Sequence, residues 1–136
     1  VYEPLYPLLK HKPDFLFEVA QCLSKTGRYE KANGYLERAV LLSSDPMLYY
    51  VMAKNEQCLG EYRQAEKHLL HAIDILPERI YPYYLLMNLY TEPSYFQPAK
   101  LKMAIDSVLT KKPKVESSAI KEMKEKARSM LNNTSI

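Results

Sequence analysis

The sequence contains no tryptophan, only three glycines and two cysteines, and no long uninterrupted run of apolar residues. A membrane-spanning helix needs about 18 or more such residues in succession, so none is expected. Three glycines leave little room for a glycine-rich loop of the kind that cradles phosphates. We expect no signal peptide. Because the chain starts at valine inside an expected helix, we interpret it as a piece of a longer protein.

What is present indicates a folded domain. The 136 residues are 47% hydrophobic and 26% charged, with twelve tyrosines, which excludes disordered and fibrous classes and allows one domain with a core. The net charge of +3 is too small to indicate nucleic-acid binding. Residues 111–128 carry seven basic and three acidic side chains, whereas the rest of the chain sums to −1. This basic segment is either the solvated face of a helix or a contact for anionic lipid or phosphate.

Two short stretches indicate an internal repeat. The sequence "GRYEKA" at residues 27–32 is followed by "GEYRQA" at residues 60–65, so Gly27 and Gly60 lie 33 positions apart. A fixed period of this length is typical of stacked repeats. The same separation relates Tyr29 and Tyr62, Ala32 and Ala65, Phe17 and Tyr50, Ala20 and Ala53, Leu36 and Leu69, and Ala39 and Ala72.

Each repeat is expected to be a helical hairpin, because apolar residues recur at helical spacing before and after each glycine. The glycine ends the first helix because it enters the left-handed region at low cost. The tyrosine fills the space beside the turn, and the alanines let neighbouring helices approach closely. Asp45 before Pro46 predicts one helix start, and Asp14 is expected to cap an earlier helix.

The two cysteines do not occupy equivalent positions in the repeat. Cys22 lies five residues before Gly27, whereas Cys58 lies two residues before Gly60. This offset turns the two side chains roughly 60° apart on neighbouring parallel helices. A disulfide between them is therefore allowed but not favoured.

A third hairpin is expected over residues 80–112, with a different turn. Where a glycine would stand, the chain has "EPSYFQPAK" at residues 92–100. Pro93 and Pro98 should lengthen the break between the helices. We expect the second helix of this hairpin from about Pro98 to Lys111.

Helical patterns also occur at both ends of the chain. Residues 1–12 predict the second helix of a truncated repeat, and residues 116–133 predict a capping helix with one polar face. The buried side chains are expected to be Leu5, Leu8 and Leu9 at the first end, and Ile120, Met123, Ala127, Met130 and Leu131 at the second.

The repeat resembles the tetratricopeptide repeat, which places small and large residues at fixed positions over about 34 residues. The resemblance implies an all-α, right-handed solenoid of helical hairpins with a C-terminal capping helix. It implies one domain over residues 1–136, with repeats at 13–45, 46–79 and 80–112. The matching residues are Leu16, Val19, Ala20, Gly27, Tyr29, Ala32, Leu36 and Ala39, and then Tyr49, Met52, Ala53, Gly60, Tyr62, Ala65, Leu69, Ala72 and Pro77.

Three segments resemble a narrower family, the C-terminal repeat region of bacterial O-antigen ligase or polymerase-like membrane proteins of cell-surface polysaccharide assembly. The segments are "LYPLLKHKPDFLF", "RIYPYYLLMNLY" and "KKPKVESSAIKEMKEKA". In that family an extracytoplasmic tetratricopeptide domain follows a membrane portion. The resemblance implies a membrane-bound parent and a periplasmic location. It places the catalytic residues in the membrane portion, so none is carried over to this chain.

No pattern in the sequence predicts catalysis, a metal site or a cofactor site. His68 and His71 lie three residues apart, a spacing that could hold a metal, but no third ligand is signalled nearby and we favour a solvated pair. Glu56 lies among apolar neighbours. It is either a perturbed acid or, as we favour, a groove-edge or ion-paired side chain. The order of a Ser-His-Asp triad is also absent.

The first helix of each hairpin is expected to line a concave surface. Residues one turn apart that miss the apolar stripe should face this groove, so an aromatic, an amide or amine, and a small polar residue recur in register. The rings could grip an extended peptide or stack on sugar rings, or they could fill space between hairpins. The predicted residues are Phe17, Gln21 and Ser24, then Tyr50, Lys54 and Gln57, then Tyr84, Asn88 and Thr91.

These features favour a non-catalytic scaffold that binds a protein or peptide partner in the concave groove, with a glycan as a further ligand and without nucleic acid. The alternative is a stand-alone cytosolic adaptor of the chaperone-binding kind. Adaptors that hold a peptide C-terminus need clustered lysine and arginine in the groove. Only Lys25 and Lys54 qualify here, so this alternative ranks second.

Overall fold

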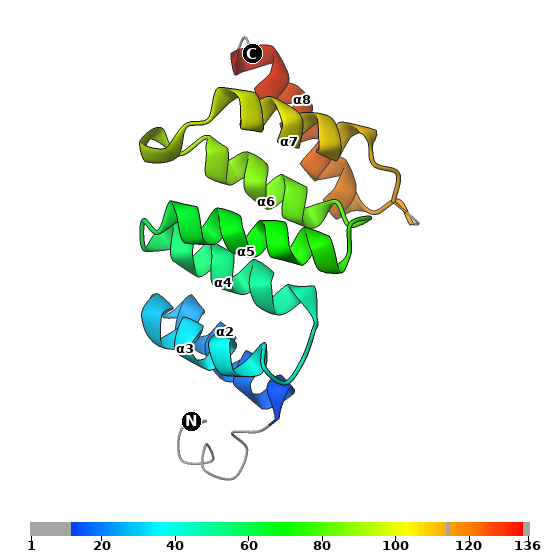
Figure 1. Ribbon diagram of the computed structural model, residues 1–136. Coiled ribbons are helices and arrows are strands. Elements are labelled where there is room, and N and C mark those ends of the chain that lie inside the picture. Colours follow the sequence, from blue (N-terminus) through cyan, green and yellow to red (C-terminus); the bar gives the residue numbers. More distant parts are fainter. Residues whose placement is uncertain (1–11, 114, 135–136) are drawn as a thin grey trace. The chain divides into compact units, whose positions relative to one another are not determined.

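The computed structural model describes residues 12–113 and 115–134, which form seven α-helices, one short 3-10 helix and no strand (Figure 1). The prediction of an all-α fold is therefore confirmed. The truncated repeat predicted at residues 1–12 lies outside the described residues except for Lys12, which precedes the first described helix. The contacts divide the chain into two compact units, with the boundary between Ile75 and Leu76 in the sequence. The single domain expected over residues 1–136 stays a prediction. Each unit is described by itself.

The first unit consists of two antiparallel hairpins, labelled in Figure 1. Its helices are α2 (Pro13–Lys25), α3 (Tyr29–Ala39), α4 (Pro46–Cys58) and α5 (Tyr62–Ile75). Helix α3 packs against α4 and so joins the hairpins. The six repeated alanines are all buried, as the sequence predicted. A central cluster of buried side chains comprises Phe15, Leu16, Val19, Ala20, Leu23, Ala32, Leu36, Ala39, Leu48 and Met52.

Both glycine turns of this unit have the same hydrogen-bonded geometry. Gly27 and Gly60 have φ angles of 81° and 78°, in the left-handed region, as the sequence predicted. At the first turn the Arg28 N–H donates to the Leu23 carbonyl at 2.8 Å, and the Gly27 N–H donates to the Ser24 carbonyl at 3.1 Å. The Glu61 and Gly60 N–H groups make the equivalent bonds at the second turn. These pairs of bonds define Schellman motifs, which satisfy the last carbonyls of α2 and α4.

The helix starts match the sequence prediction at one position and differ at another. The Asp45 carboxylate accepts a hydrogen bond from the Met47 N–H at 3.0 Å, so Asp45 caps α4 as expected. The prediction for Asp14 is wrong, because α2 already begins at Pro13 and Asp14 lies inside its first turn. An acidic side chain there still favours the helix through the helix dipole.

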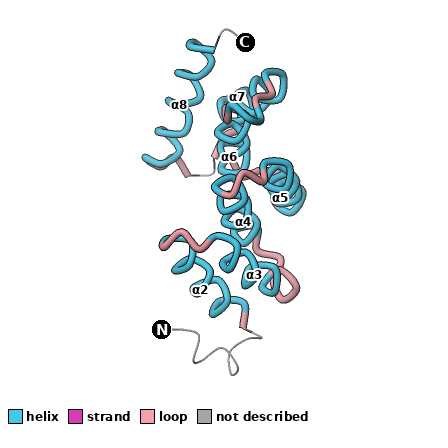
Figure 2. Tube along the Cα trace, turned by 90° about the vertical axis from the view of Figure 1, so that its left-hand side faces the viewer, coloured by secondary structure: helices cyan, strands magenta, loops and turns pink. Residues whose placement is uncertain are grey.

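The second unit contains one hairpin and a covering helix. Helix α6 (Tyr81–Tyr90) is joined to α7 (Pro98–Thr110) through the short 3-10 helix η2 (Pro93–Tyr95), so the prolines lengthen the turn as predicted. Helix α8 (Ser118–Thr134) lies along one face of the α6–α7 pair and contacts both helices (Figure 2). None of the helices in the two described ranges has both the length and the apolarity to cross a membrane.

Two contacts attach α8 to the hairpin. Ala127 is fully buried, whereas Ile120, Met123, Met130 and Leu131 are half-buried. The Lys124 amino group donates to the Leu109 and Lys111 carbonyls at 3.4 and 2.9 Å. It therefore caps the C-terminal end of α7, where carbonyl groups lack helical partners.

Candidate functional site

The first unit brings six of the nine predicted groove residues onto two helices that contact each other. Helix α2 carries Phe17, Gln21 and Ser24, and helix α4 carries Tyr50, Lys54 and Gln57. Lys54 is exposed, and both glutamines are half-buried. Phe17 is also half-buried, and it packs against the central cluster of the unit. Gln21, Lys54 and Gln57 are therefore available to a ligand, while Phe17 contributes to the core.

Tyr50 differs from its expected role. Only 5% of its surface is exposed, so the residue belongs to the buried set. A ring buried to this degree contributes mainly through packing, because aromatic side chains remove a large apolar area from water. The alternative in which the ring fills space is therefore favoured for Tyr50.

The second unit places Tyr84, Asn88 and Thr91 on α6. Tyr84 is half-buried, its ring stacks on that of Tyr81 with the centroids 6.4 Å apart, and the Lys126 amino group of α8 lies 5.5 Å from its centroid. The Thr91 hydroxyl donates to the Asn88 carbonyl at 2.7 Å and so serves the end of the helix. The covering helix α8 thus lies next to the Tyr84 side of α6.

Two polar atoms of the predicted set are buried without hydrogen-bond partners among the described residues. They are the Ser24 hydroxyl oxygen on α2 and the Asn88 side-chain carbonyl oxygen on α6. Most buried polar atoms in proteins have a partner, so such exceptions require a physical explanation. Each atom can form a hydrogen bond with a ligand that reaches it.

A buried amide pair connects α3 to α4 and was not predicted from the sequence. The Asn55 side-chain amide donates to the Asn33 side-chain oxygen at 2.8 Å, and the Asn33 amide donates to the Met52 carbonyl at 3.3 Å. Both asparagines are buried. The sequence could have indicated the pair, because Asn33 and Asn55 are polar residues at buried positions of their helices. The pair fixes the register between the two hairpins of the first unit, because each donor has one specific acceptor.

Glu56 and His68 form a further, partly buried polar contact in this unit. The His68 Nδ1 atom lies 2.7 Å from a Glu56 carboxylate oxygen, and the two side chains are 20% and 6% exposed. The rings of His68 and His71 both lie against Tyr49, with centroid distances of 5.9 and 4.7 Å. The expectation of a solvated histidine pair is thus wrong for His68, because α4 supplies a carboxylate partner. Among the described residues no three His, Cys, Asp or Glu side chains group to hold a metal.

Tyr29, the tyrosine after the first glycine turn, contacts Cys58 at the C-terminal end of α4. A hydrogen bond to Cys58 raises the pKa of the Tyr29 hydroxyl, with further contributions from the charge of that thiol and from burial. The contact accounts for the tyrosine expected beside the turn. Cys58 and Cys22 are both free and exposed.

The family model that matches the chain is described as anaphase-promoting complex, cyclosome, subunit 3, and it covers residues 1–72. This match spans more than half of the sequence and both hairpins of the first unit except for the last three residues of α5. The chain belongs to this family. Its repeats are of the tetratricopeptide type, so the resemblance inferred from the glycine, tyrosine and alanine pattern is confirmed.

Solved structures support the same architecture for this member of the family. A crystal structure of MamA matches with a TM-score of 0.74 and 17% identity, over 98% of this chain and 86% of the MamA chain. A second MamA structure matches with a TM-score of 0.73 and 18% identity, over 96% and 75% of the two chains. At such identities the likeness shows the fold alone. No curated protein sequence matches the chain. The family match and the MamA structures do not support the narrower resemblance to O-antigen ligases.

Proposed function

We propose that the chain is a non-catalytic binding module that holds a protein or peptide partner on α2 and α4 of the first unit. The observation that carries the proposal is the Ser24 hydroxyl oxygen on α2, which is buried and has no hydrogen-bond partner among the described residues. A buried polar group without a partner costs about 1–3 kcal/mol. A ligand that supplies the missing bond recovers part of that cost on binding.

Two further features support this proposal. The name of the matching family describes a subunit of a complex, which agrees with a role in assembly. Gln21, Lys54 and Gln57 keep polar groups accessible on α2 and α4. Amide side chains can donate to and accept from the backbone of an extended peptide, whereas the lysine supplies donors only. The surface therefore suits a peptide better than an apolar helix.

Site-specific photo-crosslinking tests the proposed face. A photoreactive residue replaces Gln21 or Gln57, and matched control proteins carry it at the exposed residues Glu37 on α3 or Lys67 on α5. Peptides selected from a random display library against the unmodified chain serve as probes. We expect strong crosslinks from the two glutamine positions and weak ones from the controls. Equal crosslinking from all four positions would contradict the proposal.

The narrower assignment, to the extracytoplasmic domain of an O-antigen ligase-like membrane protein, rests on the resemblance of three segments alone. It stays a prediction, together with the periplasmic location and the glycan contact. Fractionation of cells that express the full-length protein tests it, because a membrane-bound parent must sediment with the membranes. Recovery in the soluble fraction would favour the stand-alone adaptor.

A further inference from the structure

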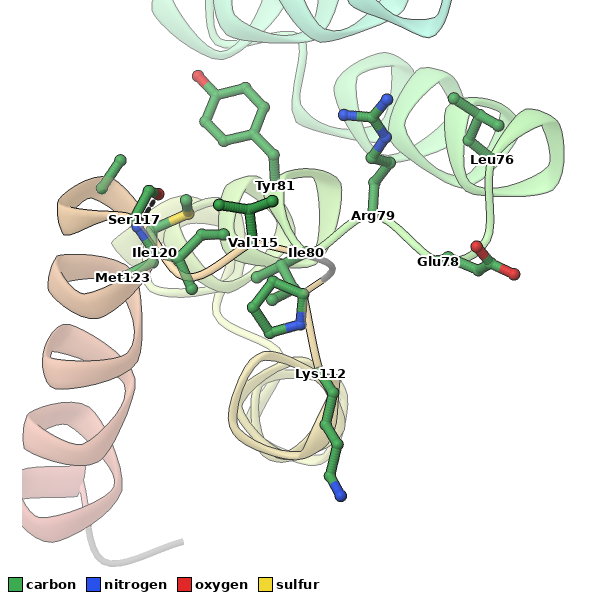
Figure 3. A pocket seen from close by; sticks show the side chains of 12 residues that line it. Leu76, Glu78, Arg79, Ile80, Tyr81, Lys112, Val115, Ser117, Ile120 and Met123 are labelled. Atoms are coloured by element: carbon green, nitrogen blue, oxygen red, sulfur yellow. Dashed lines mark hydrogen bonds between the residues drawn. The ribbon is translucent and has the colours of Figure 1, made fainter.

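The second unit contains an open cavity at the beginning of α6 and of α8 (Figure 3). Its volume is about 640 Å³, within the range of about 300–1,000 Å³ that is typical of ligand sites. Three segments form its walls: the chain that precedes α6, the connection between α7 and α8, and the first turns of α8. All of them belong to the unit that starts at Leu76.

The centre of the cavity is apolar. Ile80 is buried, and Ile120 and Met123 are half-buried on the face of α8 that looks toward it (Figure 3). Leu76 and Val115 are 38% and 76% exposed and add apolar surface to the lining. Burying a side chain of the size of leucine in such a site is favourable because it removes apolar surface from water. The lining therefore suits one bulky aliphatic or aromatic group.

The charged groups at the cavity are predominantly basic. Arg79 and Lys112 line it together with a single acidic residue, Glu78. In Figure 3 the Lys112 amino group and the Glu78 carboxylate both point away from the apolar centre. The segment from Lys111 to Arg128, which includes Lys112, has an excess of four positive charges in the sequence, and Lys112 is its basic residue among those that line the cavity. This field attracts anionic groups and repels cationic ones.

We infer that the cavity is a docking site for a short acidic peptide segment of a partner protein, with one bulky apolar residue inserted between Ile80, Ile120 and Met123. Arg79 and Lys112 are then the basic lining residues that attract the acidic residues flanking this anchor. The basic lining residues favour a peptide with acidic residues. The volume and the apolar centre of the cavity favour one bulky apolar residue as the anchor. The inference rests on the proposed function and gives it a second, separate surface, made wholly of residues that α2 and α4 do not supply.

Fluorescence anisotropy with synthetic peptides tests the inference. The probes are labelled peptides with leucine, methionine or phenylalanine between glutamates, together with matched peptides that have alanine at the anchor or lysines in place of the glutamates. We expect at least one apolar-anchored acidic peptide to bind. Replacing its anchor by alanine should weaken binding about tenfold, which corresponds to about 1.4 kcal/mol. Replacing the glutamates by lysines should abolish it.

Two pairs of variants locate the bound peptide. Met123→Glu should abolish binding, whereas Met103→Glu, at an exposed methionine of α7 outside the cavity, should leave it unchanged. Arg79→Glu should weaken binding severalfold and should improve binding of the lysine peptide, whereas Lys102→Glu on α7 should do neither. Arg79 and Lys102 are both exposed, so these two variants test the site without disturbing the core.

Three outcomes would overturn the inference. The first is failure of every acidic peptide to bind. The second is equal binding of the leucine and alanine peptides, because charge alone would then account for binding. Shifts of the Met123 methyl resonance caused by laurate but not by the peptides would assign the cavity to an anionic amphiphile instead. The crosslinks from Gln21 and Gln57 do not depend on this cavity, so a failure here and a failure of the proposed function remain distinguishable.

Discussion

The first and second units form the same helical hairpin with different turns. In the first unit, Gly27 and Gly60 adopt positive φ angles, and two short hydrogen bonds close each turn. In the second unit the connection from α6 to α7 contains η2 with Pro93, and Pro98 begins α7. The Gln97 N–H donates to the Tyr90 carbonyl at 3.4 Å. The last carbonyl groups of the first helix in a hairpin thus need hydrogen-bond donors. A glycine is not needed to provide them when the connection is longer.

The units also differ in how they complete their surfaces. The first unit packs one hairpin on another through α3 and α4, with the Asn33–Asn55 pair between them. The second unit has a single hairpin, and α8 covers one of its faces. An added helix with one apolar side leaves space at its ends, and the cavity beside Ile120 lies at such an end. The repeated hairpins therefore pack regularly against each other, whereas the covering helix α8, which is not part of the repeat, borders a candidate binding cavity.

The largest expected effect separates the tyrosines of the two units. Tyr50→Ser should lower the free energy of unfolding by about 2–5 kcal/mol, because Tyr50 is buried and its loss leaves a cavity. Tyr84→Ser should cost about 1 kcal/mol, because Tyr84 is half-buried and loses mainly its contact with Lys126. Urea unfolding followed by circular dichroism measures both. Equal losses would mean that the two residues have the same role.

The buried amide pair is specific to the first unit and tests its inter-hairpin register. Asn33→Ala or Asn55→Ala should each cost about 1–3 kcal/mol, because either change leaves the other buried amide without its partner. The double variant should lose less than the sum of the single losses, since both changes remove one shared bond. Strict additivity in a double-mutant cycle would show that the bond contributes nothing specific.

The glycine turns should be sensitive to a single added methyl group. Gly27→Ala and Gly60→Ala should each destabilise the first unit by about 1–2 kcal/mol, because alanine is strained at positive φ. No atom lies within 4 Å of an added Cβ at either position, so a steric clash cannot account for the loss. Thermal unfolding gives the difference, and an unchanged midpoint would argue against the positive φ.

The smallest expected effect has the opposite sign. Gly34 lies inside α3 without a positive φ, and an added Cβ there also meets no atom within 4 Å. Gly34→Ala should therefore stabilise the chain by about 0.5–1 kcal/mol, since alanine favours the helix. The variant is the matched control for the two turns. A loss of stability at Gly34 as large as those at the turns would contradict the attribution of the turn effects to positive φ.

Much of the fold could be predicted because the repeat is local. The spacing of Gly27, Tyr29 and Ala32, found again 33 residues later, was sufficient for the hairpins, their turns and the buried alanines. Helical periodicity states which residues share a face of one helix. Capping follows equally local rules, and the prediction succeeded for Asp45, although it failed for Asp14, where Pro13 begins the helix.

The candidate sites depended on more than periodicity. The sequence by itself determined the all-α repeat, the glycine turns and the residues that each inner helix presents together. Only the tertiary structure decided that Tyr50 is buried, that Asn55 meets Asn33, that Glu56 meets His68, and that α8 leaves a cavity beside Ile80. These contacts join residues of different helices. They depend on how each helix is rotated and shifted against its neighbour, and side-chain packing sets that rotation across the whole unit.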